Sequence, residues 1–326
     1  MSVSRVEEIN YMSSGSRINS TSTIVHSKAQ ETANSTRATL RRLRSEMVAL
    51  HAAQAIPEEL LNAYIKYGNN ADGLPALHAA IKARDERAMR LFLDHGADPN
   101  ACTVPQIGFD RYPVPRTALE FAATFANSGI VNLLIDRGAN VNPERSMTSP
   151  LQCAAKSNNL EVIRILVQRG ADLKKEQSDH YGALMVAASE GHSEAVTTLI
   201  QLGMNPNGPN SFGQTPLDGA LRAYVQYTRE ESFAGIETLL TKGASPNVKS
   251  YGYTALHTVA GFADSLNSEP KLLKITELLL KHGVDVNALN DQGKTALGIL
   301  AQQRRPGFSY PALEKLLKEH GAVERK

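Results

Sequence analysis

The sequence lacks tryptophan, is poor in aromatic side chains and holds only two cysteines. Aromatic residues make up 6% of the 326 positions, whereas large compact cores usually rely on such rings. A core built instead from Ala, Leu, Ile and Val favours many small helices packed closely together. Two cysteines, Cys102 and Cys153, are too few for a disulfide framework, which fits a reducing compartment.

The chain also lacks an excess of charge of one sign and any long apolar run. Its 35 basic and 33 acidic side chains give a net charge of +2, which provides no electrostatic footprint for nucleic acid or an anionic membrane. No stretch approaches the ~20 apolar residues that span a bilayer, and the N-terminus has no apolar secretory core. We therefore expect a soluble, monomeric, cytoplasmic protein, with the nucleus as the alternative location.

What the sequence does contain is a pattern that occurs about seven times. Each unit opens on a leucine in a Thr-Pro-Leu-like segment and closes on a glycine that follows an apolar run. The opening residues are Leu77, Leu119, Leu151, Leu184, Leu217, Leu256 and Leu297, and the closing residues are Gly96, Gly138, Gly170, Gly203, Gly243, Gly283 and Gly321. In the first four units the glycine follows the leucine by 19 positions. Such a fixed period is typical of a repeat architecture.

This pattern resembles the ankyrin-repeat family, whose unit of roughly 33 residues is a β-turn followed by two helices with a Thr-Pro-Leu-His-x-Ala signature. Thr254-Ala255-Leu256-His257 matches the signature closely, and Thr215-Pro216-Leu217-Asp218 matches it up to the histidine. The resemblance covers residues 72–323. It implies an all-α solenoid, elongated and curved, built of helix-turn-helix units with β-hairpin or turn loops.

The pattern also predicts the domain organisation. Residues 1–36, rich in Ser and Thr, are expected to be disordered because they hold too little apolar surface to offset their ordering entropy. Residues 37–71 are expected to form a long helix and a degenerate capping repeat. The seven repeats are then 72–101, 116–145, 146–177, 178–210, 211–249, 250–290 and 291–326, the last a C-terminal cap, with a proline-containing insert at 102–115.

The residues that could carry chemistry form no recognisable constellation. Neither cysteine belongs to a Cys-x-x-Cys pair, and the sequence holds no His-Glu-x-x-His motif and no phosphate-binding loop. His78 and His257 occupy the signature position after leucine, where the resemblance implies a ring that hydrogen-bonds neighbouring backbone. We therefore expect no enzymatic activity, no cofactor and no metal site.

A solenoid of this kind offers an extended concave face made of hairpin tips and the exposed side of each first helix. Positions on that face predict a partner-binding surface at Tyr181, Phe212, Tyr251, Tyr253, Phe262, Phe125, Arg222 and Lys156. The aromatic residues concentrate in the fourth to sixth repeats, and exposed Tyr and Phe are favoured anchors of interfaces. For Phe212 and Tyr251, packing on their own hairpins is the alternative interpretation.

These features favour a non-enzymatic interaction module, an adaptor or scaffold that binds another protein on its concave face. The alternative is a regulatory subunit or effector that controls a target enzyme or transcription factor, with the Ser-rich arm as a modification site. A third hypothesis, from a different class, is an enzyme whose chemistry lies in the inserts. Replacing Tyr253 and Phe262 together with Ala is expected to abolish partner binding while leaving the melting temperature nearly unchanged.

Overall fold

The computed structural model describes residues 76–102, 116–125, 127–144, 148–178, 182–227, 229–263, 269–303 and 310–325. Within these ranges every regular element is an α-helix, and pairing of the β type is limited to two isolated bridges. The architecture is therefore all-α, as the sequence predicts. The expected disordered segment 1–36, the expected helix and capping repeat at 37–71 and nearly all of the insert 102–115 lie outside the described residues.

Backbone contacts place residues 76–80 and 87–97 in one compact unit and residues 81–86, together with the described residues from 98 onward, in another. The division passes through the first described helix pair, α3 (Ala76–Ala83) and α4 (Glu86–Asp94). Helix α4 buries Met89, Phe92 and Leu93 on one face.

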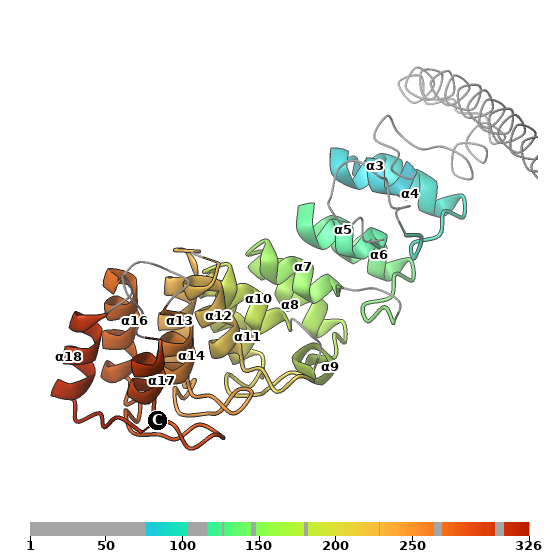
Figure 1. Cartoon of the computed structure of the whole chain (residues 1–326). Helices are drawn as coiled ribbons and strands as arrows, with labels where there is room; N and C mark the ends of the chain where they lie inside the picture. Colours follow the sequence, from blue (N-terminus) through green and yellow to red (C-terminus); the bar gives the residue numbers. More distant parts are fainter. Residues whose placement is uncertain are drawn as a thin grey trace, which may run out of the picture. The chain divides into compact units, whose positions relative to one another are not determined.

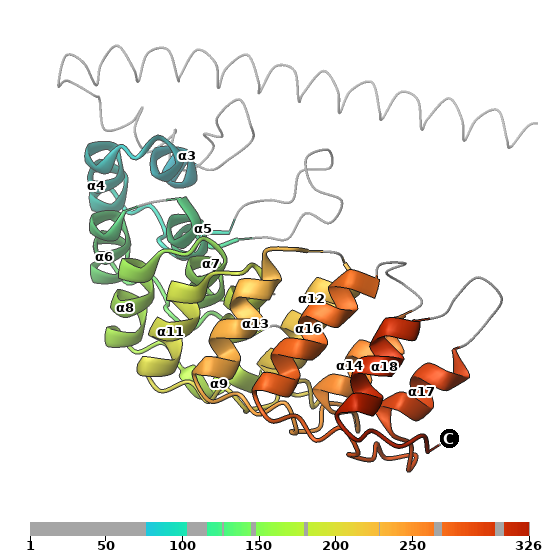
Figure 2. The same cartoon turned by 90° about the vertical axis from the view of Figure 1, so that its left-hand side faces the viewer.

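The second unit is a series of helix pairs that follow one another in sequence order (Figures 1 and 2). The pairs are α5 (Ala118–Phe125) with α6 (Ser128–Asp136), α7 (Pro150–Lys156) with α8 (Leu160–Gln168), α10 (Ala183–Ser189) with α11 (Ser193–Gln201), α12 (Pro216–Val225) with α13 (Ser232–Thr241), α14 (Ala255–Gly261) with α16 (Glu269–Lys281), and α17 (Ala296–Gln302) with α18 (Pro311–Glu319). Each first helix contacts the first helix of the next pair, from α5 through to α17. The first helices therefore form one layer of the unit, and the second helices cover it.

Small side chains let the first helices approach closely. Alanine pairs are fully buried in α5, α7 and α10: Ala122 and Ala123, Ala154 and Ala155, and Ala187 and Ala188. The second helices carry larger apolar residues at helical spacing, and in α8 Val162, Ile163 and Leu166 are buried. The core is thus a continuous layer between stacked helices, which no single pair could enclose.

The helix starts follow the capping residues that the sequence offers. Ser149 caps α7 through a reciprocal box in which the Gln152 amide N–H donates to Ser149 Oγ, at 3.0 Å between nitrogen and oxygen. Thr215 and Thr295 cap α12 and α17 through their hydroxyl oxygens. Gly182, at the N-cap of α10, has no side chain that could accept from the first turn, so α10 begins without a side-chain cap.

Asparagine side chains connect the ends of neighbouring repeats. Four positions after the closing glycine stand Asn100, Asn142, Asn207, Asn247 and Asn287. In each case Nδ2 donates to the carbonyl oxygen of the next closing glycine, and Oδ1 accepts from the backbone N–H two residues beyond that glycine. These donor–acceptor distances lie between 2.7 and 3.0 Å. We call this set the asparagine ladder.

The third repeat departs from the ladder. Its corresponding position is Lys174, and a short helix, α9 (Leu173–Ser178), begins there. Asp172 starts this helix, because its Oδ1 atom accepts from the backbone N–H groups of Lys174 and Lys175. The repeat pattern does not predict α9, because residues 173–178 fall where the pattern has an ordinary repeat end.

Candidate functional site

A groove of about 390 Å³ lies over the first helices of the fifth, sixth and seventh repeats. Its lining includes Arg222 from α12, Gly261 and Phe262 from α14 and its C-terminal end, Ile299 from α17, and Tyr253 and Lys294 from the hairpins that precede α14 and α17. Three of the predicted partner-binding residues, Arg222, Tyr253 and Phe262, therefore share one concave feature.

The position of Arg222 is fixed by a buried carboxylate. Arg222 Nε donates to Asp218 Oδ2 one helical turn earlier, at 2.7 Å, and the Asp218 side chain is only 4% exposed. Thr258 Oγ1, from α14, donates to Asp218 Oδ1 at 2.8 Å, and Gln214 Nε2 donates to Oδ2 at 3.2 Å. Asp218 stands where the repeat signature has histidine, so this departure from the pattern is what anchors the arginine.

The guanidinium of Arg222 also lies against two aromatic rings, which belong to other parts of the chain than α12. Its central carbon lies 5.6 Å from the centroid of the Tyr251 ring and 5.2 Å from that of Phe262. A cation at this distance from a ring face is attracted by the ring quadrupole. Among the described residues, neither terminal nitrogen of the guanidinium has a hydrogen-bond partner. The charged group is therefore rigidly placed while its two best donors remain available.

Tyr251 reaches this cluster from a strained turn. Ser250 and Tyr253 exchange backbone hydrogen bonds across a two-residue loop, in which Tyr251 has φ 52° and Gly252 has φ 80°. Turns of this kind require positive φ at both central positions and favour Asn-Gly, whereas a bulky side chain with positive φ is uncommon. The Tyr251 side chain is 50% exposed and lies against Arg222 of the preceding repeat. It therefore contacts more than its own hairpin.

Replacing Tyr251 by Asn should raise the free energy of unfolding by about 0.5 kcal/mol, because relief of a left-handed bulky residue outweighs the loss of an exposed ring–cation contact. Urea unfolding followed by circular dichroism measures the change. Tyr253→Asn is the matched control and should be destabilising, because Tyr253 is half-buried and packs edge-on against His257 at 6.2 Å between ring centroids. This packing corrects the expectation from sequence that loss of Tyr253 leaves the melting temperature nearly unchanged. Equal destabilisation by both variants would contradict the strain at Tyr251.

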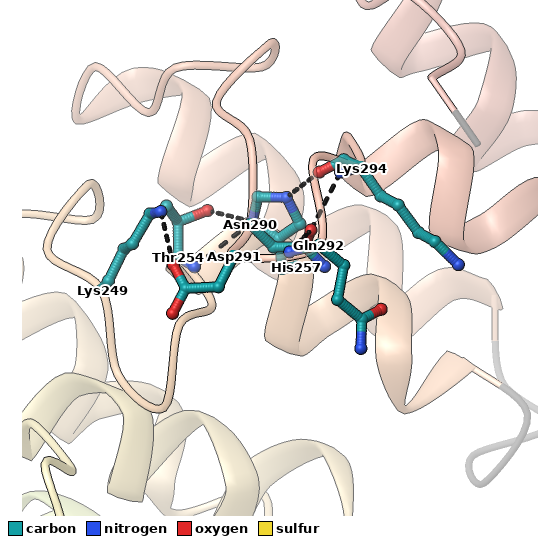
Figure 3. Close-up of polar contacts among 7 residues, drawn as sticks. All are labelled: Lys249, Thr254, His257, Asn290, Asp291, Gln292 and Lys294. Atoms are coloured by element: carbon teal, nitrogen blue, oxygen red, sulfur yellow. Dashed lines mark hydrogen bonds and ion pairs between the residues drawn. The ribbon is translucent and has the colours of Figure 1, made fainter.

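His257 connects the two hairpins beside the groove (Figure 3). Its Nδ1 atom accepts from the Thr254 backbone N–H at 3.2 Å, and its Nε2 atom donates to the Lys294 carbonyl oxygen at 3.0 Å. The ring is 1% exposed, and this burial lowers the pKa of His257. The charge of Lys249 lowers the pKa further, while the hydrogen bond to the Lys294 carbonyl opposes the change. The backbone-bonding role that the sequence predicts for His257 is confirmed.

Because the folded state holds His257 neutral, the unfolded state binds more protons in mildly acidic solution, and stability should fall as the pH drops below the ordinary His pKa of about 6.5. In His257→Gln this component should be absent, since Gln152 already serves the same cap position in α7. Melting temperatures measured from about pH 7.5 to 5.5, a window around that pKa of about 6.5, test the difference. The other histidines are unchanged in this variant, so parallel curves would contradict the assignment to His257.

The remaining predicted site residues lie elsewhere or outside the described part of the chain. Phe212, on the hairpin before α12, is 47% exposed, and Phe125, at the end of α5, is 46% exposed. Lys156 is exposed at the end of α7, where its carbonyl oxygen accepts from His192 Nε2. None of these three lines the groove. Tyr181 lies outside the described residues.

Sequence reasoning missed two residues that shape the groove. Asp218 was visible only as a departure from the signature histidine, followed four residues later by an arginine. Gly261 ends α14 and lines the groove, and a Cβ atom at this position would meet no other atom within 4 Å. The alternation of small residues along the first helix was the available signal for Gly261.

The described ranges contain neither a candidate metal site nor a candidate membrane-spanning helix. In these residues no group of three or more His, Cys, Asp or Glu side chains could hold a metal ion. No helix in the same ranges is long and apolar enough to cross a membrane. Cys153, in α7, is 6% exposed, and burial raises the pKa of its thiol, so it packs as a small core residue.

Family models agree with the repeat geometry. A model for three consecutive ankyrin repeats matches residues 47–145, 105–177 and 151–249, and a single-repeat model matches residues 251–291. The chain belongs to the ankyrin-repeat family. Ankyrin repeats are generally protein–protein interaction modules, and the family is typically non-enzymatic.

Curated relatives share the repeats but are longer proteins. Mouse "Ankyrin repeat and SOCS box protein 16" is 34% identical over 213 residues, which is 64% of this chain and 45% of that protein. A Caenorhabditis elegans homologue of transient receptor potential cation channel subfamily A member 1 is 26% identical over 132 residues, 40% of this chain and 10% of the relative. A putative ankyrin repeat protein of Acanthamoeba polyphaga mimivirus is 33% identical over 113 residues, 33% of this chain and 19% of the relative. The chain thus spans less than half the length of these relatives.

Among solved structures, the human ASB11 ankyrin repeat domain superposes with a TM-score of 0.55 at 21% sequence identity. The match covers 76% of this chain and 99% of that domain. At this identity the likeness shows the fold alone, an ankyrin solenoid.

Proposed function

We propose that this ankyrin-repeat chain is a non-enzymatic adaptor that binds a partner protein in the groove over α12, α14 and α17. The observation that carries the proposal is the placement of Arg222. A buried carboxylate and two aromatic rings hold its guanidinium at the groove, and its terminal nitrogens still lack partners among the described residues.

The composition of the groove suits an interface centre. Arg, Tyr and Phe are enriched where binding energy concentrates, and such residues act most strongly when a partner excludes water from them. An arginine that is already ordered loses little side-chain entropy on binding, which removes part of the usual cost of association. Tyr253 and Phe262, the aromatic residues predicted as anchors, line the same groove as this ordered charge.

The sharpest test fills the groove without touching its existing contacts. Gly261→Gln places a side chain in the open space at the end of α14, and Gln also has a higher helix propensity than Gly. Partner proteins captured by the immobilised chain and identified by mass spectrometry should be lost from this variant, whose melting temperature should not fall. Gly129→Gln, in α6 of the opposite layer, is the matched control, because a Cβ there makes contacts no closer than 3.5 Å.

The double variant Tyr253→Ala, Phe262→Ala tests the same surface by removal. Loss of both rings should lower affinity for a captured partner by at least ~100-fold, which corresponds to about 2.8 kcal/mol. Calorimetric titration of wild type and variant with the same partner measures it. Partners that bind wild type, the double variant and Gly261→Gln equally well would place the interface elsewhere and overturn the proposal.

A further inference from the structure

We infer that the occupant of the groove is an extended acidic segment of the partner, with a carboxylate that meets Arg222 and Lys294 and a neighbouring apolar side chain against Phe262 and Ile299. This inference rests on the proposed function and adds the chemistry of the bound partner. It follows from the charges, the free donors and the size of the groove.

The fixed charges that line the groove are all positive. Its lining contains Arg222 and Lys294 and no acidic side chain. The carboxylate that binds Arg222, on Asp218, is buried and already accepts from Arg222, Thr258 and Gln214. A ligand therefore meets the cations and is shielded from the buried carboxylate.

The acidic side chain at the neighbouring hairpin tip is also engaged. Asp291 forms an ion pair with Lys249, with 2.8 Å between Asp291 Oδ1 and Lys249 Nζ (Figure 3). Neither residue lines the groove. Lys294 has a different neighbour, since its Nζ atom donates to the neutral amide oxygen of Gln302 at 2.9 Å. Within the described residues the ammonium of Lys294 thus has no acidic counter-ion, which makes it available to one from outside.

Arg222 adds geometric selectivity to this charge. Its Nε atom already donates to Asp218. Its two terminal nitrogens lie in the same plane and can donate in parallel to the two oxygens of a second carboxylate. Stacking between Tyr251 and Phe262 restricts rotation of that plane. A carboxylate in the plane of the guanidinium should therefore bind better than other groups. A basic group would be repelled by the two cations, and a neutral group would leave donors of Arg222 unpaired.

The size of the groove favours a linear segment over a folded surface. Its volume of about 390 Å³ lies in the lower part of the 300–1,000 Å³ range typical of ligand sites, so it encloses a few side chains. Phe262 and Ile299 supply apolar walls beside the two cations. One acidic and one apolar side chain, projecting from an extended backbone, match this arrangement.

The test uses the full chain, immobilised, and a phage-displayed library of random linear peptides as the probe. Enriched peptides should carry Asp or Glu two positions away from an aliphatic or aromatic residue, because alternate side chains of an extended segment share one face. In a synthetic copy of an enriched peptide, replacing that acid by its amide should weaken binding at least ~10-fold. Lys294→Glu should reverse the selection toward Lys or Arg, whereas Lys315→Glu, the same charge change on exposed α18, should leave the acidic preference intact.

The outcomes separate the two proposals. If Gly261→Gln abolishes binding of the enriched peptides but those peptides carry no acidic residue, or if Lys294→Glu leaves the selection unchanged, the acidic occupant is wrong and the groove remains the binding site. If enriched peptides bind Gly261→Gln as well as wild type, the groove itself is wrong. If no peptide is enriched on the wild-type chain more than on the Gly261→Gln variant, the inference of an acidic segment is also overturned.

Discussion

Gly235→Ala is expected to lower the free energy of unfolding by about 3 kcal/mol, because the added methyl group has no room. Gly235 lies in α13, and a Cβ atom built there falls 2.0 Å from the carbonyl oxygen of Ala188 and 2.7 Å from its carbonyl carbon. Both atoms belong to the backbone at the end of α10, which cannot rotate away as a side chain can. The methyl group therefore forces the two helices apart.

The contact that would open is a junction between repeats. Around Gly235, Ser232 Oγ donates to the Ser189 carbonyl oxygen and Ser193 Oγ donates to the Ala234 carbonyl oxygen, so α10 and α11 are held to α13 by short polar contacts. In a repeat array, stability is close to a sum of repeat and nearest-neighbour terms. Weakening this one junction should let α5–α11 and α12–α18 unfold separately, seen as two transitions in urea.

Two other glycines serve as controls. A Cβ at Gly219, in α12, meets the flexible side chain of Met185 at 2.5 Å, which can move, so Gly219→Ala should cost less than Gly235→Ala. Gly261→Ala adds a methyl group in open space and should stabilise by about 0.5–1 kcal/mol, the ordinary helix-propensity gain. Denaturant unfolding of the three variants ranks them. Equal effects at all three positions would show that backbone crowding does not decide the result.

Much of this fold follows from local rules that the sequence displays. The period, the Thr-Pro start at Thr215 and the alanine pairs each dictate a helix pair that must stack on its neighbours, and the structure has these features where they were expected. The agreement reflects physics that acts within one repeat or between adjacent ones, so a single sequence carries it.

The groove depends on contacts that no local rule supplies. Arg222, Tyr251 and Phe262 lie in two repeats and meet only because Asp218 replaces the signature histidine and Thr258 of the next repeat binds that carboxylate. Predicting positions on a concave face selected these residues, but it selected Phe125 and Lys156 with equal weight. The importance of Gly235 is hidden for the same reason, since its neighbour Ala188 lies in another repeat.

The asparagine ladder leads to a second large effect. Asn207→Ala removes a donor at 2.9 Å to the Gly243 carbonyl oxygen and an acceptor at 2.7 Å from the Ser245 backbone N–H. Each hydrogen bond contributes about 0.5–1.5 kcal/mol net, so the expected loss in free energy of unfolding is about 2 kcal/mol. Lys174→Ala is the matched control, because Lys174 holds the same repeat position without the bridge and is exposed. It should change stability by less than about 0.5 kcal/mol.

Combining ladder variants tests whether each junction acts on its own. Asn142 bridges a different pair of repeats, to the Gly170 carbonyl oxygen and the Asp172 backbone N–H, and shares no partner with Asn207. The loss in free energy of unfolding caused by Asn142→Ala should therefore add to the loss caused by Asn207→Ala. In urea unfolding the double variant should match the sum of the two losses within about 0.5 kcal/mol. Asn207→Ala and Gly235→Ala, in contrast, weaken one junction, and their combined loss should be smaller than the sum, because the second change acts on contacts already loosened by the first. Strict additivity of this second pair would contradict a shared junction.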